Sequence, residues 1–163
     1  MLVKGIHRKT VTFEDGRLVL VNQPLLPPRF ETVSYTNYRE VAEAIKSMVV
    51  RGAPAIGAAA AFAMALAEAE GADMEEAAAL VKAARPTAQD LFFAVNTVLA
   101  AVRSGKGAAA AAAGIATAYE SACRKIGEFG AGLISNGMVL NTHCNAGWLA
   151  TVDWGTATAP MYM

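Results

Sequence analysis

The sequence predicts an α/β protein with two parts. Residues 1–135 would form a mainly helical N-terminal domain with a small β element, and residues 136–163 would begin a Rossmann-like parallel-sheet domain that is incomplete. Three observations support this: alternating apolar residues near the N-terminus, long alanine-rich segments with helix boundary signals, and a strand–turn–helix pattern after residue 137. Alanine favours helix strongly and buries little area, so the helices should pack closely.

The β element is expected within the first 35 residues. Val11 and Phe13 alternate with polar residues, Asp15-Gly16 is a hairpin turn signal, and residues 18–21 form the returning strand. A short extended segment at residues 32–35 would add a third strand.

Boundary signals define the helices that follow. Asn37 and Glu40 have capping-box spacing, and Val41, Ile45 and Met48 would share one face of a helix that ends at Arg51-Gly52. Pro54 suits the first position of the next helix. The remaining predictions are helices at residues 54–70 and 74–84, a helix capped by Thr87 with Asp90, a helical alanine run at residues 108–113, and a last helix at residues 116–135.

The pattern changes near the C-terminus. Residues 138–141 are expected to form a strand, residues 142–147 a turn of small and polar residues, and Trp148 the start of a helix. A parallel sheet needs more strands than this, so the sequence predicts that a second domain is cut short at residue 163. Four apolar side chains would then lack the sheet that covers them: Trp148, Leu149, Val152 and Trp154.

Composition excludes several classes of function. The chain has 14 basic and 14 acidic residues and no basic stripe, which argues against a nucleic-acid partner. Residues 53–69 approach membrane-spanning length, but alanine is weakly hydrophobic, so a buried helix is favoured and no membrane partner is expected. Cys123 and Cys144 give no disulfide framework, which indicates a reduced, cytoplasmic chain, and no Cys/His pairs have the spacing of a metal site.

Two arginines precede predicted helix starts. Gly52 and Ala53 would let a ligand approach the backbone, and the helix N-terminus at Pro54 favours an anion, to which Arg51 adds a charged donor. Arg85 repeats this arrangement before the next helix. The alternative is an ordinary turn with a surface arginine. Two such elements in one small domain favour a shared phosphate site.

Cys144 lies in the turn after the predicted strand. A thiolate would be favoured near helix amides at the carboxyl end of a strand, although a small buried thiol that fills a tight turn is an equal alternative. His143 and Cys144 are sequence neighbours that should point apart, so His143 is expected to form structural hydrogen bonds rather than a catalytic pair. Cys123 is expected in the core, and His7 carries no signal.

Three segments together resemble the methylthioribose-1-phosphate isomerase family, which also contains ribose-1,5-bisphosphate isomerases and regulatory subunits of the translation-initiation exchange factor. They are residues 38–57 (YREVAEAIKSMVVRGAPAIG), 85–88 (RPTA) and 141–157 (NTHCNAGWLATVDWGTA). The resemblance implies that Arg51, Gly52, Ala53 and Arg85 bind substrate and that Cys144 is catalytic. It also implies a homodimer, and no cofactor or metal.

The implied reaction is an aldose–ketose isomerisation that converts 5-methylthioribose 1-phosphate to 5-methylthioribulose 1-phosphate in methionine salvage. Two alternatives remain open: a ribose-1,5-bisphosphate isomerase, or a non-catalytic regulatory or assembly subunit of the same family. The catalytic aspartate and the Asn-Lys pair of the family lie further downstream, and no position here matches them. The chain alone is therefore expected to be inactive and to need the remainder of the enzyme as a partner.

Overall fold

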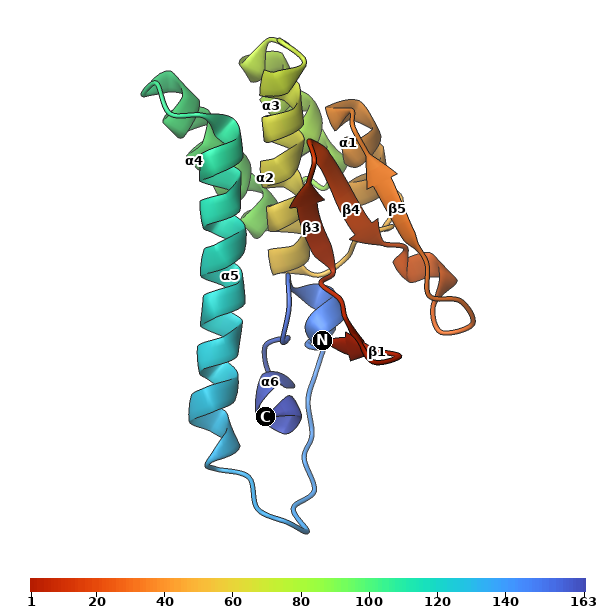
Figure 1. Cartoon of the computed structure of the whole chain (residues 1–163). Helices are drawn as coiled ribbons and strands as arrows, with labels where there is room; N and C mark the ends of the chain where they lie inside the picture. Colours follow the sequence, from red (N-terminus) through yellow and green to blue (C-terminus); the bar gives the residue numbers. More distant parts are fainter.

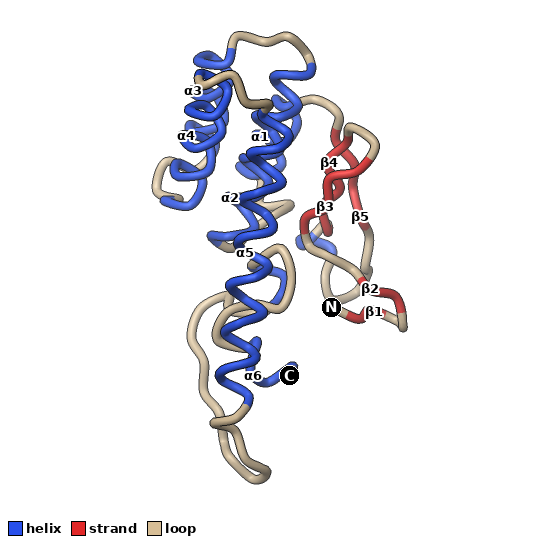
Figure 2. Tube along the Cα trace, turned by 60° about the vertical axis from the view of Figure 1, so that its left-hand side comes forward, coloured by secondary structure: helices blue, strands red, loops and turns tan.

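The computed structural model describes all 163 residues as a layer of helices with a small antiparallel sheet on one side (Figure 1). Turned by 60°, the chain shows the sheet beside the helices and one long helix, near the label α5, extending below the rest of the helical layer (Figure 2). The helices are α1 (Tyr38–Lys46), α2 (Ala53–Ala69), α3 (Met74–Ala84), α4 (Gln89–Arg103), α5 (Ala108–Ala131) and α6 (Ala159–Tyr162), with 3₁₀ turns η1 (Gln23–Leu25) and η2 (Trp148–Ala150). The coarse α/β prediction is confirmed.

The predicted sheet forms with the order β3-β4-β5. Strands β3 (Val11–Glu14), β4 (Arg17–Val21) and β5 (Thr32–Tyr35) are antiparallel, with Val11 opposite Leu20 and Leu20 opposite Val33. Apolar side chains of β3 and β4 face the helices, and the ring of Phe13 stacks on Phe62 of α2 with 4.8 Å between centroids. A second, two-stranded hairpin, β1 (Leu2–Val3) with β2 (Ile6–His7), was not predicted.

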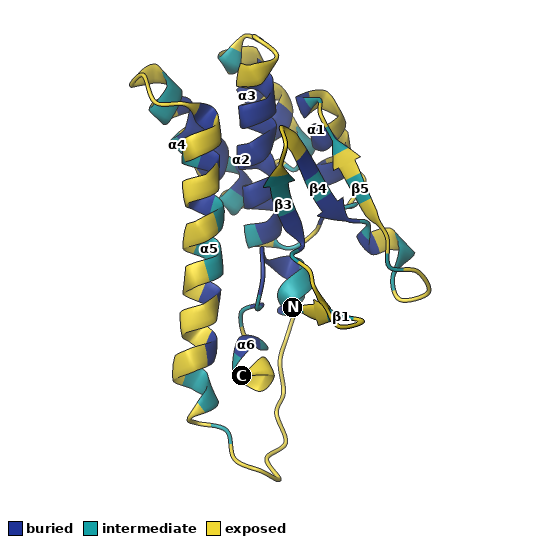
Figure 3. Ribbon diagram, viewed as in Figure 1, coloured by how far each residue is buried: buried dark blue, intermediate teal, exposed yellow.

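Helix α2 lies at the centre of the helical layer. It is buried on every side from Ala55 to Ala67, and α1, α3, α4 and α5 all pack against it (Figure 3). Because its core side chains are mostly methyl groups, four neighbouring helices can approach one axis. The prediction of a buried helix is confirmed, and no helix in the structure has both the length and the apolar composition needed to cross a membrane.

Three helix boundaries differ from the prediction. Helix α1 ends at Lys46, because the amide of Val49 donates to the carbonyl of Ala44 (2.9 Å) and Met48 turns into the left-handed region, so Met48 leaves the apolar face. Thr87 lies in a turn and does not cap α4, whose N-cap is Ala88 with no side-chain hydrogen bond. The two predicted C-terminal helices are one continuous α5, which ends before Asn136-Gly137.

Two carboxylates at the end of α2 cap other helices. Glu70 accepts from the backbone amide of Tyr38 (3.1 Å) and from the Asn37 side chain (3.0 Å) at the start of α1. Glu68 accepts from the amide of Ala108 (2.8 Å) at the start of α5, where the N-cap Gly107 has no side chain to serve. The reciprocal Glu40 half of the predicted capping box is not formed, although Asn37 does accept from the amide of Arg39 (2.9 Å).

We expect Glu68→Ala to lower the free energy of unfolding by about 1 kcal/mol, because a helix N-terminus loses both its hydrogen-bond acceptor and a favourable charge. Urea denaturation followed by circular dichroism measures the change. Glu43→Ala is the matched control, since Glu43 is an exposed helical glutamate with only a 4.0 Å contact to Lys46. Equal stability of the two variants would show that the cap contributes nothing.

The predicted strand at residues 138–141 does not form. This segment belongs to an exposed, irregular stretch at residues 132–145, in which Val139 is 97% exposed. A strand is stabilised by pairing with a neighbour, and no neighbouring strand lies beside this segment. The helix predicted from Trp148 is also wrong, because only the single turn η2 forms there.

Residues 146–163 fold back onto the helical layer instead. The carbonyl of Val152 accepts from the amide of Thr10 (3.0 Å), and Val152 is only 2% exposed, which contradicts the expectation that it lacks cover. Trp148, Leu149 and Trp154 are half-buried. Helix α6 packs on α5. The buried carboxylate of Asp153 lies 2.6 Å from the N-terminal amine and 2.9 Å from His7 Nε2, so the two ends of the described chain are joined through charge.

Candidate functional site

All five residues that the sequence singled out border one hollow of about 690 Å³. It lies where the N-terminus of α2, the turn between α3 and α4, and the returning C-terminal segment meet. The predicted residues at its edge are Arg51, Gly52, Ala53, Arg85 and Cys144. Sequence reasoning missed Met48, Asn145, Thr151 and Thr156, which border the same hollow. All four lie inside segments that carry the family resemblance, at residues 38–57 and 141–157, but no feature of the sequence assigned a role at the site to any of them.

Gly52 brings the two halves of the hollow together. It is the N-cap of α2 and has φ +102°, a conformation that favours glycine. A Cβ atom at this position would lie 2.4 Å from Cα of Ala150 and 2.6 Å from its carbonyl oxygen. The absence of a side chain therefore allows the Ala150 turn to rest directly on the start of α2.

The two arginines give the hollow its positive charge. Arg51 is exposed and forms no ion pair, and Arg85 has a buried Nη1 atom with no hydrogen-bond partner. No acidic side chain borders the hollow. Since the first amides of α2 lack intrahelical acceptors, the site combines free guanidinium donors with a helix N-terminus, which suits a phosphate group.

Cys144 is exposed in the loop that borders the hollow and has φ +67°, which is uncommon for a residue with a side chain. The loop is fixed two residues later, where the carbonyl of Ala146 accepts from the Thr156 amide (2.9 Å) and the Thr158 hydroxyl (3.0 Å). His143 is also exposed at the hollow and forms no hydrogen bond within this chain, so its structural role stays a prediction. The sequence does not indicate that the backbone of Cys144 adopts the left-handed conformation.

We expect Thr158→Val to raise the alkylation rate of Cys144 by about threefold, because the loop loses a hydrogen bond that holds it against residues 155–158. Mass spectrometry of iodoacetamide-treated protein measures the rate. Cys123 is the internal control: it is buried in α5, and burial raises the pKa of its thiol. Thr158→Ser should restore the original rate. Equal acceleration at Cys123 would mean that the variant has simply loosened the fold.

Asp90 and Tyr119 lie behind this site, against Gly57 of α2. A Cβ atom on Gly57 would be 3.0 Å from the Tyr119 hydroxyl and 3.2 Å from Cβ of Asp90. The hydroxyl is buried without a hydrogen-bond partner. Burial, with a contribution from Asp90, raises the pKa of Tyr119 from 10.0 to about 12, and burial also raises the pKa of Asp90.

Tyr119→Phe should therefore stabilise the protein at neutral pH by up to about 1 kcal/mol, because an unpaired buried hydroxyl is removed. The raised pKa adds a pH dependence: between pH 10 and about 12 the tyrosine ionises in the unfolded chain but not in the folded one, so stability is lost as pH rises through this window. Denaturation at pH 7 and at pH 11 measures this effect: the free energy of unfolding should fall less between the two pH values in Tyr119→Phe than in the unsubstituted chain. A destabilised variant would mean that the hydroxyl has a partner in solution.

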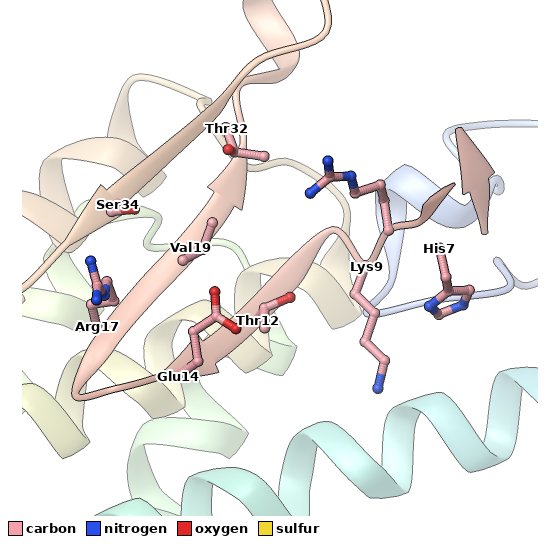
Figure 4. Close-up of a pocket in the computed structure, with 9 residues that line it drawn as sticks. His7, Lys9, Thr12, Glu14, Arg17, Val19, Thr32 and Ser34 are labelled. Carbon is pink, nitrogen blue, oxygen red and sulfur yellow. The ribbon is translucent and has the colours of Figure 1, made fainter. Parts of the chain in front are cut away.

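A second hollow, of about 440 Å³, lies on the outer face of the sheet (Figure 4). It is bordered by polar side chains such as Thr12, Ser34 and Arg17. Two of its cations have carboxylate partners: Lys9 lies 2.7 Å from Glu120, and Arg17 lies 3.6 Å from Asp15. A third cation at its border, Arg8, forms no ion pair. This surface contains none of the predicted site residues, so the hollow beside Arg51 is the candidate site.

The fold and this site place the chain in a known family. The sequence model of the initiation factor 2 subunit family matches residues 49–157, and the chain therefore belongs to that family. The matched segment contains every residue predicted for the site.

Several curated relatives carry the same name. The methylthioribose-1-phosphate isomerase of Methylorubrum extorquens is 45% identical over 181 residues, which cover all of this chain and 50% of the relative. A protein of Methanothermobacter thermautotrophicus that provisionally carries the same name is 48% identical over 154 residues, or 93% of this chain and 48% of its own length. The chain thus spans about half the length of the curated relatives it matches.

Two solved structures have the same fold. The 5-methylthioribose 1-phosphate isomerase of Pyrococcus horikoshii matches with a TM-score of 0.83 and 40% identity, over 93% of this chain and 47% of that one. The delta subunit of translation initiation factor eIF-2B from A. fulgidus matches with a TM-score of 0.85 and 38% identity, over 94% of this chain and 50% of that one.

Proposed function

We propose that this chain supplies the phosphate-binding and thiol half of an aldose–ketose isomerase that converts 5-methylthioribose 1-phosphate to 5-methylthioribulose 1-phosphate in methionine salvage. The observation that carries the proposal is the convergence of Arg51, Arg85 and Cys144 on one hollow from three separate parts of the sequence. The names of the relatives support the choice of substrate.

The residues at the hollow have two roles, phosphate binding and proton transfer. Arg51, Arg85 and the first amides of α2 at Gly52-Ala53 hold the phosphate, which does not react. A sugar phosphorylated at its anomeric carbon cannot open its ring freely, so a proton must be supplied to the ring oxygen and another moved between carbons 1 and 2. The Cys144 thiol is exposed to the hollow and serves as one acid/base group.

The second acid/base group has no candidate in this chain. No carboxylate borders the hollow, and Asp153 is buried and occupied by the N-terminal amine. We therefore assign this carboxylate to a Rossmann-like domain, equivalent to the further half that the relatives have. The exposed apolar side chains near the end of α5 and in the following loop support such a contact, namely Ile126, Phe129, Leu133, Met138, Val139 and Leu140. A cytoplasmic homodimer completes the proposal.

Two other functions within the family are alternatives to the proposed isomerase. A regulatory subunit is supported by the match to the initiation-factor delta subunit, which is as close in fold as the isomerase. A ribose-1,5-bisphosphate isomerase would need a second phosphate site. The one free arginine pair favours a substrate with a single phosphate.

A chimera tests the proposal. Residues 1–163 are joined to the half of the P. horikoshii isomerase that lies beyond the matched region, and conversion of 5-methylthioribose 1-phosphate is followed by NMR. We expect turnover by the chimera and none by residues 1–163 alone. Preferential turnover of ribose 1,5-bisphosphate would support the related isomerase, and phosphate-ester binding without turnover of either sugar would support a regulatory subunit.

A further inference from the structure

Met48 closes helix α1 in an unfavourable conformation. It has φ +62° and is followed by the hydrogen bond from the Val49 amide to the Ala44 carbonyl (2.9 Å), so it occupies the left-handed position that ends many helices. Glycine is preferred there because a Cβ atom is strained in this region. The fold would thus be more stable with a different residue at this position.

Packing does not explain why a methionine is present. The Met48 side chain is 49% exposed and does not belong to the hydrophobic core or to the partly buried residues that pack on it. Its neighbours Lys46 and Ser47 are exposed as well, so no apolar surface of α1 continues through it. Within the described chain, the side chain contributes little to folding.

Met48 does border the hollow that contains Arg51, Arg85 and Cys144. The other apolar residues at this hollow are a proline and alanines, namely Ala53, Pro54, Ala146, Ala150 and Ala157. Met48 is therefore the single long, flexible apolar side chain of the site. Its thioether is polarisable and can adapt to an irregular apolar group.

We infer that Met48 is a specificity-determining residue that contacts the apolar methylthio group of the substrate. This inference rests on the proposed function, and it concerns the end of the substrate that lies opposite the phosphate. The phosphate on carbon 1 binds the arginines, whereas the methylthio group on carbon 5 is uncharged and is stabilised by apolar contact. The half-exposed side chain of Met48 is free to cover that group when the sugar is bound. The left-handed backbone at Met48 then lowers the stability of the fold, but it places the side chain where it can contact the substrate.

The test uses the chimera and two sugars, 5-methylthioribose 1-phosphate and ribose 1-phosphate, which has a hydroxyl in place of the methylthio group. In Met48→Gly, the ratio of kcat/KM for the first sugar to that for the second should fall about tenfold, the effect expected when a small apolar contact is lost. In the same variant of residues 1–163, Tm should rise by about 2 °C, because the backbone strain is relieved. Loss of specificity and gain of stability in one variant cannot both follow from a purely structural role.

Met48→Leu is the matched control. It keeps an apolar side chain and the strained backbone, so the ratio should stay within about threefold and Tm should not rise. An unchanged ratio in Met48→Gly would overturn the inference and leave the proposed function standing. A lower ratio accompanied by a lower Tm would also overturn it, since Met48 would then act through folding. Absence of all turnover in the unsubstituted chimera would overturn the proposed function, and this inference with it.

Discussion

Gly52→Ala should lower the free energy of unfolding of residues 1–163 by about 3–5 kcal/mol. Two costs combine at this position. The backbone has φ +102°, which an L side chain rarely adopts, and the new Cβ would lie 2.4 Å from Cα of Ala150. Because the obstructing atom belongs to the backbone, the Ala150 turn must move as a unit and the hollow must open.

Gly71→Ala separates these two costs. Gly71 also has a positive φ, +69°, but its Cβ would meet nothing within 4 Å. This control should lose only about 1 kcal/mol, which is the backbone cost alone. Urea denaturation of both variants gives the comparison. A Gly52→Ala protein as stable as the Gly71→Ala protein would show that the Ala150 turn is not pressed against α2 in solution.

In the chimera, Cys144→Ser should lower kcat by about 100-fold while changing KM by less than about threefold. A thiol gives and accepts a proton near neutral pH far more readily than a hydroxyl, and the exchange keeps the size of the side chain almost constant. The phosphate contacts proposed for Arg51 and Arg85 would not involve this atom, so affinity should be retained. Steady-state kinetics on 5-methylthioribose 1-phosphate measures both constants.

Two variants serve as controls for this experiment. Cys123→Ala removes the other thiol, which is buried in α5, and should leave kcat unchanged apart from any loss of stability. Arg51→Ala should show the opposite pattern, with a raised KM and a smaller effect on kcat, because the phosphate does not react. Normal turnover in Cys144→Ser would mean that the thiol only fills its loop.

The sequence predicted correctly those elements whose structure depends on residues that are close together in the chain. The hairpin at Asp15-Gly16 and the burial of the alanine-rich helix follow from turn chemistry and propensity, and both are confirmed. Helix α2 starts at Ala53, one residue before the predicted start at Pro54. The site motifs were recognisable because Arg51, Arg85 and Cys144 lie in short, distinctive segments. A shared site for Arg51 and Arg85 was a hypothesis that the geometry supports, and Cys144 borders the same hollow, whereas the roles of all three residues stay predictions.

The errors arose where distant parts of the chain decide the structure. Residues 138–141 have the composition of a strand but no partner beside them, and composition alone does not supply one. The division into domains at residue 135 stays a prediction. Thr87 has the chemistry of a cap but lies in a turn that its neighbours define, and Met48 leaves its helix through a conformation that sequence rarely signals.

The carboxylates at the end of α2 have a consequence for how the chain folds. Glu68 accepts a hydrogen bond from a backbone amide in the first turn of α5, and Glu70 accepts one from a backbone amide in the first turn of α1. In the sequence, α1 precedes α2 and α5 follows it. Starting a helix is the unfavourable step of its formation. Because part of that step is assisted here by a different helix, α1 and α5 gain their full stability only after the end of α2 has formed between them. Peptides that correspond to α1 or α5 alone should then be weakly helical, and folding should be cooperative across the helical layer. The start of α2, where the candidate site lies, would be stabilised in part by contacts made at the opposite end of the same helix.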